Sequence, residues 1–185
     1  MYPDAGPPFS FQIGAPRVND LRGRTACDVQ EAIVEMFPYN TERLVIFWNS
    51  LPIPFTYKYE VSDYIDIFVE MCHELVSNAG GTTRQMLASN AMNVTWDVSW
   101  LGDDLRVDAN WALMPHEFET RHPGYRSLAM RKSSFLAEWA VLMRGIERAV
   151  EQSGVQLEDP RQLEAMRELC ETIESSYGLR GYLYS

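Results

Sequence analysis

The sequence predicts a single α+β domain in which an antiparallel sheet packs against about four helices. Apolar residues alternate with polar ones over residues 93–113, in the pattern of two strands joined by a tight turn. In four other stretches they recur at helical spacings of three and four. Strands and helices do not alternate as βαβ units, which favours an antiparallel sheet. A length of 185 residues with 46% hydrophobic residues fits one domain, spanning 1–185, with its own core.

The first quarter of the chain predicts a tail, two short strands and a helix. Residues 1–8 contain three prolines and are expected to be irregular. Alternation over 9–13 predicts an edge strand, and the compact apolar run 44–48 predicts another strand. Between them, apolar spacing predicts a helix over 25–37 that stops at Pro38.

The next stretch predicts a strand, a long helix and a connector. The two prolines of the LPIPF sequence exclude a central strand there, and residues 55–59 can resume one. Ser62 is expected to cap a helix over 62–78, which the following Gly-Gly pair ends. Residues 82–90 are polar and predict a connector.

The last third predicts two more helices, over 134–153 and 160–177. Asp159 precedes a proline at the first position of the second helix, as is typical of a helix start. Residues 115–132 show little pattern and predict a loop, and residues 180–184 fit a last short strand.

The hairpin at 93–113 is predicted to have one apolar and one polar side. A two-residue turn at Gly102-Asp103 places all of its tryptophans on one face, which is typical of a core. The same register sets Asp97 directly across from Asp108, with Arg106 on the diagonal. Like charges so opposed destabilise a pair of strands. Either these carboxylates splay into water, or a partner's Arg or Lys lies between them.

Negative charge is concentrated in the middle of the chain. Residues 56–119 carry eleven acidic and three basic side chains, which accounts for −8 of the net −10. Such a surface repels nucleic acid and acidic membranes and attracts basic protein partners. We therefore expect a binding surface formed mainly by the hairpin, with two helical carboxylates at its rim: Asp97, Asp103, Asp104, Asp108, Glu70 and Glu74.

The sequence offers little for catalysis, and no catalytic residue, metal ligand or cofactor is predicted. The zinc helix motif needs two histidines four residues apart, whereas His116 and His122 are six apart and flanked by prolines. No glycine-rich phosphate loop is present. One alternative stays open, a hydrolase with a site assembled from these histidines, Glu117 and Cys27. Another is a subunit of a larger assembly that uses the aromatic residues of 52–59 as its interface.

The cellular compartment is expected to be the cytoplasm. The chain contains no apolar run of about 18 residues that could span a membrane, and it begins without a secretory signal. Its three widely spaced cysteines are typical of free thiols in a reducing compartment.

Three aromatic stretches resemble small cytoplasmic immunity proteins of bacterial polymorphic-toxin and contact-dependent inhibition systems. These stretches are residues 46–57, the tryptophan hairpin, and Phe135 to Trp139. The resemblance implies a non-enzymatic antidote that binds a cognate toxin domain and blocks its active site. Contact residues differ among immunity families, so the resemblance assigns none to this chain. It supplies a candidate for the basic partner, a toxin effector domain, and leaves the oligomeric state open.

Overall fold

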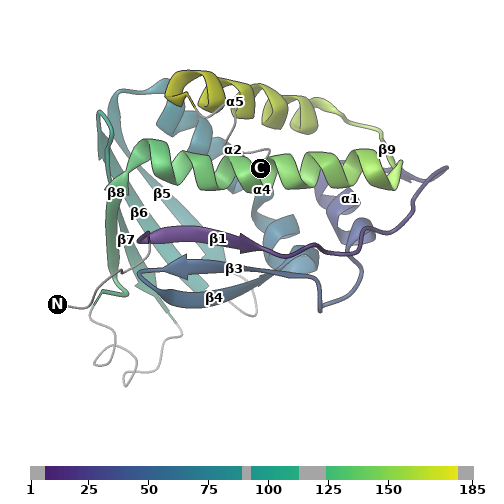
Figure 1. Ribbon diagram of the computed structural model, residues 1–185, viewed down its shortest axis with the longest axis horizontal. Coiled ribbons are helices and arrows are strands. Elements are labelled where there is room, and N and C mark those ends of the chain that lie inside the picture. The colour runs from purple at the N-terminus through teal and green to yellow at the C-terminus, as the bar shows by residue number, and fades with distance from the viewer. Residues whose placement is uncertain (1–6, 89–92, 113–123, 179–185) are drawn as a thin grey trace.

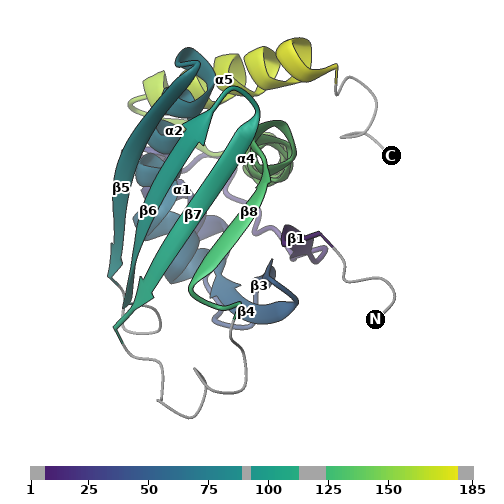
Figure 2. The same ribbon diagram turned by 90° about the vertical axis from the view of Figure 1, so that its left-hand side faces the viewer.

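The computed structural model describes residues 7–88, 93–112 and 124–178, and its largest sheet has four antiparallel strands. Helices lie behind one face of this sheet, and no described element covers the other face (Figures 1 and 2). The predicted α+β class with an antiparallel sheet is confirmed. In spatial order the strands are β5 (Gly80–Ala88), β6 (Asn93–Leu101), β7 (Asp104–Trp111) and β8 (Ser127–Arg131).

The four predicted helices are confirmed to within a few residues. The largest difference is at the first, which begins four residues later than expected because Asp28 caps it by accepting a hydrogen bond from the amide of Glu31 at 2.9 Å. Thr25 and Ala26 instead form β2, which pairs in parallel with β9 (Gln156–Leu157). The helices are α1 (Val29–Met36), α2 (Ser62–Ser77), α4 (Lys132–Ser153) and α5 (Arg161–Tyr177).

A second antiparallel sheet has the order β1-β3-β4, so β4 is an edge strand and can hold both prolines. The strand expected to resume at 55–59 ends at Thr56, because a π-helical turn η1 (Tyr57–Val61) follows and leads into α2. The buried Glu60 carboxylate accepts hydrogen bonds from both the amide and the hydroxyl of Thr56. Because η1 runs directly into α2, Ser62 lies within a continuous helical segment and does not cap it. The strands are β1 (Phe9–Ile13), β3 (Arg43–Trp48) and β4 (Leu51–Thr56).

The connector predicted at 82–90 is wrong, because β5 pairs with β6 over nine consecutive positions. Gly81 makes this pairing possible, since a Cβ atom there would stand 2.8 Å from the ring of Trp100. The predicted loop 115–132 likewise contains β8. Both strands are at sheet edges; the inward positions of β5 include the polar Thr83 and Gln85, and β8 has only five residues, too few for a clear pattern.

The predicted hairpin register is confirmed along β6 and β7, including Asp97 opposite Asp108. Its tryptophan side joins the layers of the fold. Trp96 stacks on Trp48 of the second sheet, with ring centroids 5.4 Å apart. The centroid of its ring also lies 6.4 Å from that of Phe68 on α2 and 6.4 Å from that of Trp139 on α4. The hairpin is therefore a central part of the core.

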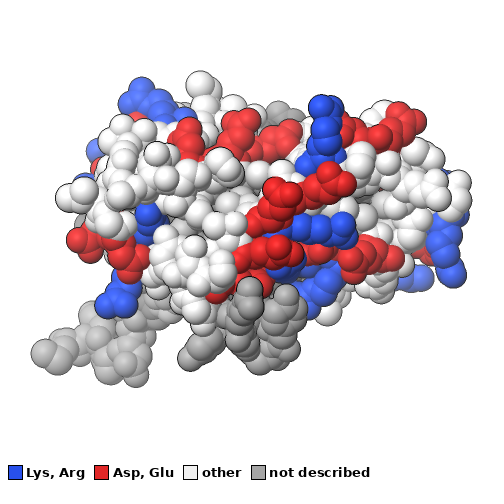
Figure 3. All heavy atoms as spheres, turned by 90° about the horizontal axis from the view of Figure 1, so that it is seen from above, with Lys and Arg blue, Asp and Glu red and all other residues white. Residues whose placement is uncertain are grey.

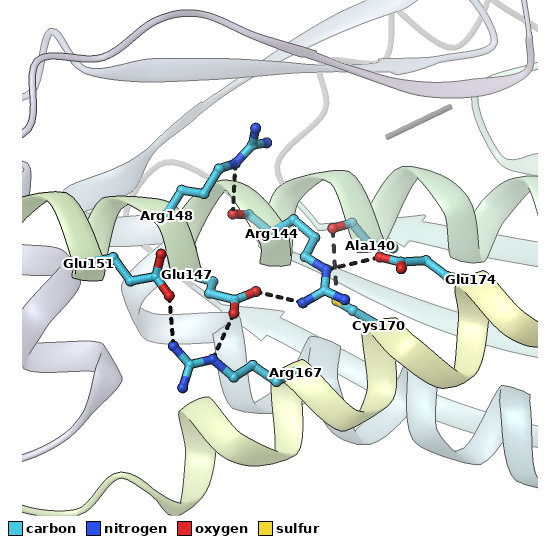
Figure 4. Close-up of polar contacts among 8 residues, drawn as sticks. All are labelled: Ala140, Arg144, Glu147, Arg148, Glu151, Arg167, Cys170 and Glu174. Carbon is cyan, nitrogen blue, oxygen red and sulfur yellow. Dashed lines mark hydrogen bonds and ion pairs between the residues drawn. The ribbon is translucent and has the colours of Figure 1, made fainter. Parts of the chain in front are cut away.

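Ion pairs join α4 to α5 (Figure 4). Arg144, whose side chain is only 12% exposed, bonds Glu147 at 2.7 Å and Glu174 at 2.9 Å. Arg167 bridges Glu147 and Glu151. Part of this network is therefore buried between the two helices. Seen from above, basic side chains accordingly lie among the acidic ones (Figure 3).

Candidate functional site

The opposed aspartates of the hairpin lie on the uncovered face of the four-stranded sheet, and each has its own arginine. Arg84 on β5 faces Asp97 in the strand register, and its Nε lies 2.6 Å from the Asp97 Oδ1. Arg106 bonds Asp108 through two nitrogens, at 2.8 and 2.6 Å, and thereby lowers the pKa of Asp108. Both carboxylates are thus paired within the fold, so the like charges are compensated without a partner, and binding of a partner's cation there stays a prediction.

Asp103 and Asp104, at the hairpin turn, are placed differently. The Asp103 carboxylate accepts hydrogen bonds from the amide of Ser133 at 2.8 Å and from its hydroxyl at 3.1 Å, and so caps the start of α4. Asp104 faces Arg131 across the β7–β8 pair. The hairpin carboxylates thus have contacts within the fold, and their contribution to partner binding stays a prediction.

The uncovered sheet face is electrically balanced and only shallowly hollowed. One hollow, of about 750 Å³, lies over the end of the sheet near the hairpin turn and is bordered by Thr82, Ser99, Arg106 and Ala129. Leu101 and Met86 are the large apolar side chains most exposed here, at 78% and 66%, and they are not neighbours in the strand register. On the strands themselves the charged residues are Arg84, Arg106, Arg131, Asp97, Asp104 and Asp108, and Arg126, just before β8, borders a hollow together with Asp97 and Asp108.

The exposed side of α2 is acidic, and no basic residue of the same helix offsets its negative charge. Four carboxylates are exposed along α2, and the helix contains no Lys or Arg. Burial raises the pKa of Asp66, and the negative charges of Asp28 and Glu70 raise it further against one hydrogen bond from Gln30. We call this surface the α2 acidic face; its residues are Asp63, Asp66, Glu70 and Glu74.

The six predicted site residues therefore do not form one surface. Glu70 and Glu74 lie on a helix behind the sheet, whereas Asp97 and Asp108 lie on its uncovered face (Figure 2). The spacing of Asp66, Glu70 and Glu74 at intervals of four could have identified the α2 acidic face from sequence, because such residues share one side of a helix. Arg84 was missed because its strand lacks apolar alternation.

The two alternatives receive no support from the described residues. Cys27 is exposed, but the Glu31 carboxylate raises the pKa of its thiol, which disfavours the nucleophilic thiolate. His116, Glu117, Glu119 and His122 lie outside the described residues. Within residues 7–88, 93–112 and 124–178, no three His, Cys, Asp or Glu side chains are grouped so that they could hold a metal ion.

The aromatic interface expected at 52–59 is largely absent from the surface. Phe55 and Tyr57 are buried, at 1% and 3% exposure, because they pack into the core. Tyr59 is the aromatic residue of this stretch that stays exposed, at 44%. The expectation of an exposed aromatic patch here is therefore wrong.

In the described part of the chain, every helix is too short or too polar to cross a membrane. No family model, curated protein or solved structure matches this chain. What the protein does must therefore be argued from its own surface.

Proposed function

We propose that this protein is a non-enzymatic binding protein that captures a basic protein partner through the α2 acidic face. One observation carries the proposal: four exposed carboxylates share a helix that has no Lys or Arg. Burial raises the pKa of Asp66, and the negative charges of Asp28 and Glu70 raise it further because they repel its ionised carboxylate. A cationic surface that docks there relieves this repulsion and gains complementary charge contacts.

The class of partner follows from the resemblance of the aromatic stretches to immunity proteins. An antidote of this kind acts in the cytoplasm and covers the active site of a toxin domain. Toxin domains that cleave nucleic acid need a basic groove for their substrate, and an acidic face complements such a groove. We propose a toxin effector domain of this chemistry as the partner, with Glu70 and Glu74 at the centre of contact.

The test is binding of the purified product of the reading frame next to this gene, measured by calorimetry at 50 and 200 mM salt. The triple variant Asp66→Asn/Glu70→Gln/Glu74→Gln is expected to bind about tenfold or more weakly, since it loses three charges from one face. The matched control, Asp97→Asn/Asp108→Asn, is expected to bind within about twofold of the native protein, because each of its carboxylates is already paired.

Equal binding by the triple variant, or binding that does not weaken with salt, would contradict the proposed role of the α2 acidic face. Co-expression supplies a second readout: the native protein should restore growth of cells that express the partner, and the triple variant should restore it less.

A further inference from the structure

The outer edge of β5 presents unpaired backbone groups to solvent. The amide of Gly102 donates to the carbonyl of Ala79 at 2.7 Å, so these two opposed residues form a hydrogen-bonded pair of the β5–β6 ladder. Hydrogen-bonded and non-hydrogen-bonded pairs alternate along an antiparallel ladder. Odd-numbered residues of β5 therefore bond β6, and the even-numbered ones direct their N–H and C=O groups away from the sheet. Among the described residues none of these outward groups has a hydrogen-bond partner; they belong to Gly80, Thr82, Arg84, Met86 and Ala88.

The other edges of the two antiparallel sheets are protected against strand pairing. On β1, the amide of Phe11 donates to the half-buried Glu138 carboxylate at 2.7 Å. The β4 edge carries two prolines, and β8 has only five residues before the chain turns into α4. In contrast, β5 has nine residues in unbroken register, no proline and one charged residue, Arg84. A long edge without such protection is a template for another strand.

The charge around β5 indicates which strand fits. In Figure 2, β5 forms the left-hand edge of the sheet, and α2 lies behind the sheet and contacts β5. Alternate side chains of a strand added to this edge point toward the helical layer, where Glu70 and Glu74 are exposed. A second copy of this chain is disfavoured, because both copies carry a net charge of −10 and antiparallel pairing of the two β5 edges places both α2 acidic faces on one side.

We propose that β5 receives an extended segment of the basic partner as a fifth strand, with Lys or Arg at alternate positions over the α2 acidic face. Backbone hydrogen bonds to the five outward residues provide affinity, and the alternate basic side chains provide specificity. This inference rests on the proposed function and specifies how the partner is held.

The test uses two nine-residue peptides of identical composition, one alternating Lys with Thr and one with its lysines in a single block. Hydrogen exchange is followed by NMR on the labelled full chain. With the alternating peptide, the outward amides, including those of Thr82, Arg84 and Met86, should become at least tenfold more protected. Their odd-numbered neighbours, already bonded to β6, should change little. The block peptide should protect the outward amides less.

Met86→Pro removes one outward N–H without removing a bond to β6, and Met86→Ala is its matched control. The proline variant should bind the alternating peptide about tenfold more weakly than the alanine variant. Should the proline variant fail to fold, the protection pattern in the native chain decides. Absence of protection at millimolar peptide overturns strand addition. Equal protection by both peptides overturns the part of the proposal in which alternate basic side chains provide specificity.

The triple variant of the α2 acidic face separates the two proposals. If it loses the peptide while Met86→Pro keeps it, strand addition is wrong and the acidic face stands. If Met86→Pro loses the peptide while the triple variant keeps it, β5 is a strand acceptor and the acidic face is not what selects its partner.

Discussion

The two acidic regions in the middle of this chain differ in how their carboxylates are compensated. On the hairpin, Asp97 and Asp108 each bond an arginine, and Asp103 caps a helix. On α2, the carboxylates have no basic residue on their own helix, and Glu70 contributes to the raised pKa of Asp66. The carboxylates of the first region are paired within the fold, and the second region is the one that we propose binds a partner.

This difference shows why charge counted along a sequence does not locate charge in space. A strand brings in residues from its neighbours, so Arg84 on β5 cancels Asp97 on β6. A helix sets residues four apart on the same side, and on α2 these are again acidic. On the sheet face, arginines therefore offset the negative charge of Asp97 and Asp108. On the α2 acidic face, no Lys or Arg of the same helix offsets the carboxylates.

The sharpest test of the hairpin's structural role is Trp96→Ala. Trp96 is 1% exposed and contacts rings from β3, α2 and α4. Its removal should lower the free energy of unfolding by about 3–5 kcal/mol, through lost burial and the cavity that remains. Chemical denaturation measures this change. Leu101→Ala, at the exposed end of the same strand, should change stability by less than about 0.5 kcal/mol and serves as the control. Similar losses in both variants would contradict a core role for the tryptophan side.

A smaller effect is expected where a hairpin carboxylate supports a helix. Asp103→Ala removes the acceptor for the amide and hydroxyl of Ser133 and should lower the free energy of unfolding by about 1 kcal/mol. Asp104→Ala, one residue along, has no cap to lose and should lower it much less. Denaturant melts of both variants provide the measurement, and a larger loss from Asp104→Ala would show that the cap does not stabilise α4.

The sequence predicts the parts of this fold that follow from local periodicity. The four helices and the register of the hairpin follow from apolar spacing and from the turn at Gly102-Asp103. The strands β5 and β8 could not be predicted this way, because the inward positions of β5 include the polar Thr83 and Gln85, and β8 has only five residues. They are identified by their pairing with β6 and β7 and not by a pattern of their own.

The candidate site was predicted only in part, for the same reason. Glu70 and Glu74 were predicted as exposed acidic residues, and the helix on which they lie is confirmed. The compensation of Asp97 could not be predicted without β5, because Arg84 reaches it only through strand pairing. A helical face can thus be derived from its own residues, whereas the charge of a sheet face depends on neighbouring strands.

The smallest and most direct test sets Asp66 against Asp108, whose pKa values shift in opposite directions. Burial, Asp28 and Glu70 raise the pKa of Asp66 above 3.8, whereas the hydrogen bond from Arg106 lowers that of Asp108. The folded state therefore holds the Asp66 proton more tightly than the unfolded state. Its contribution to stability is complete below pH 3.8 and is lost as the pH rises through the folded pKa.

Asp108 behaves in the opposite way. Its contribution is present above the unfolded pKa and is lost as the pH falls through its lowered folded pKa. At pH 7, Asp66→Asn should therefore raise the free energy of unfolding and Asp108→Asn should lower it, each by at most about 0.5 kcal/mol after screening by solvent. Both differences should shrink toward pH 3. Urea unfolding followed by tryptophan fluorescence between pH 3 and 7 measures them, and equal signs at pH 7 would remove the distinction between the two acidic regions.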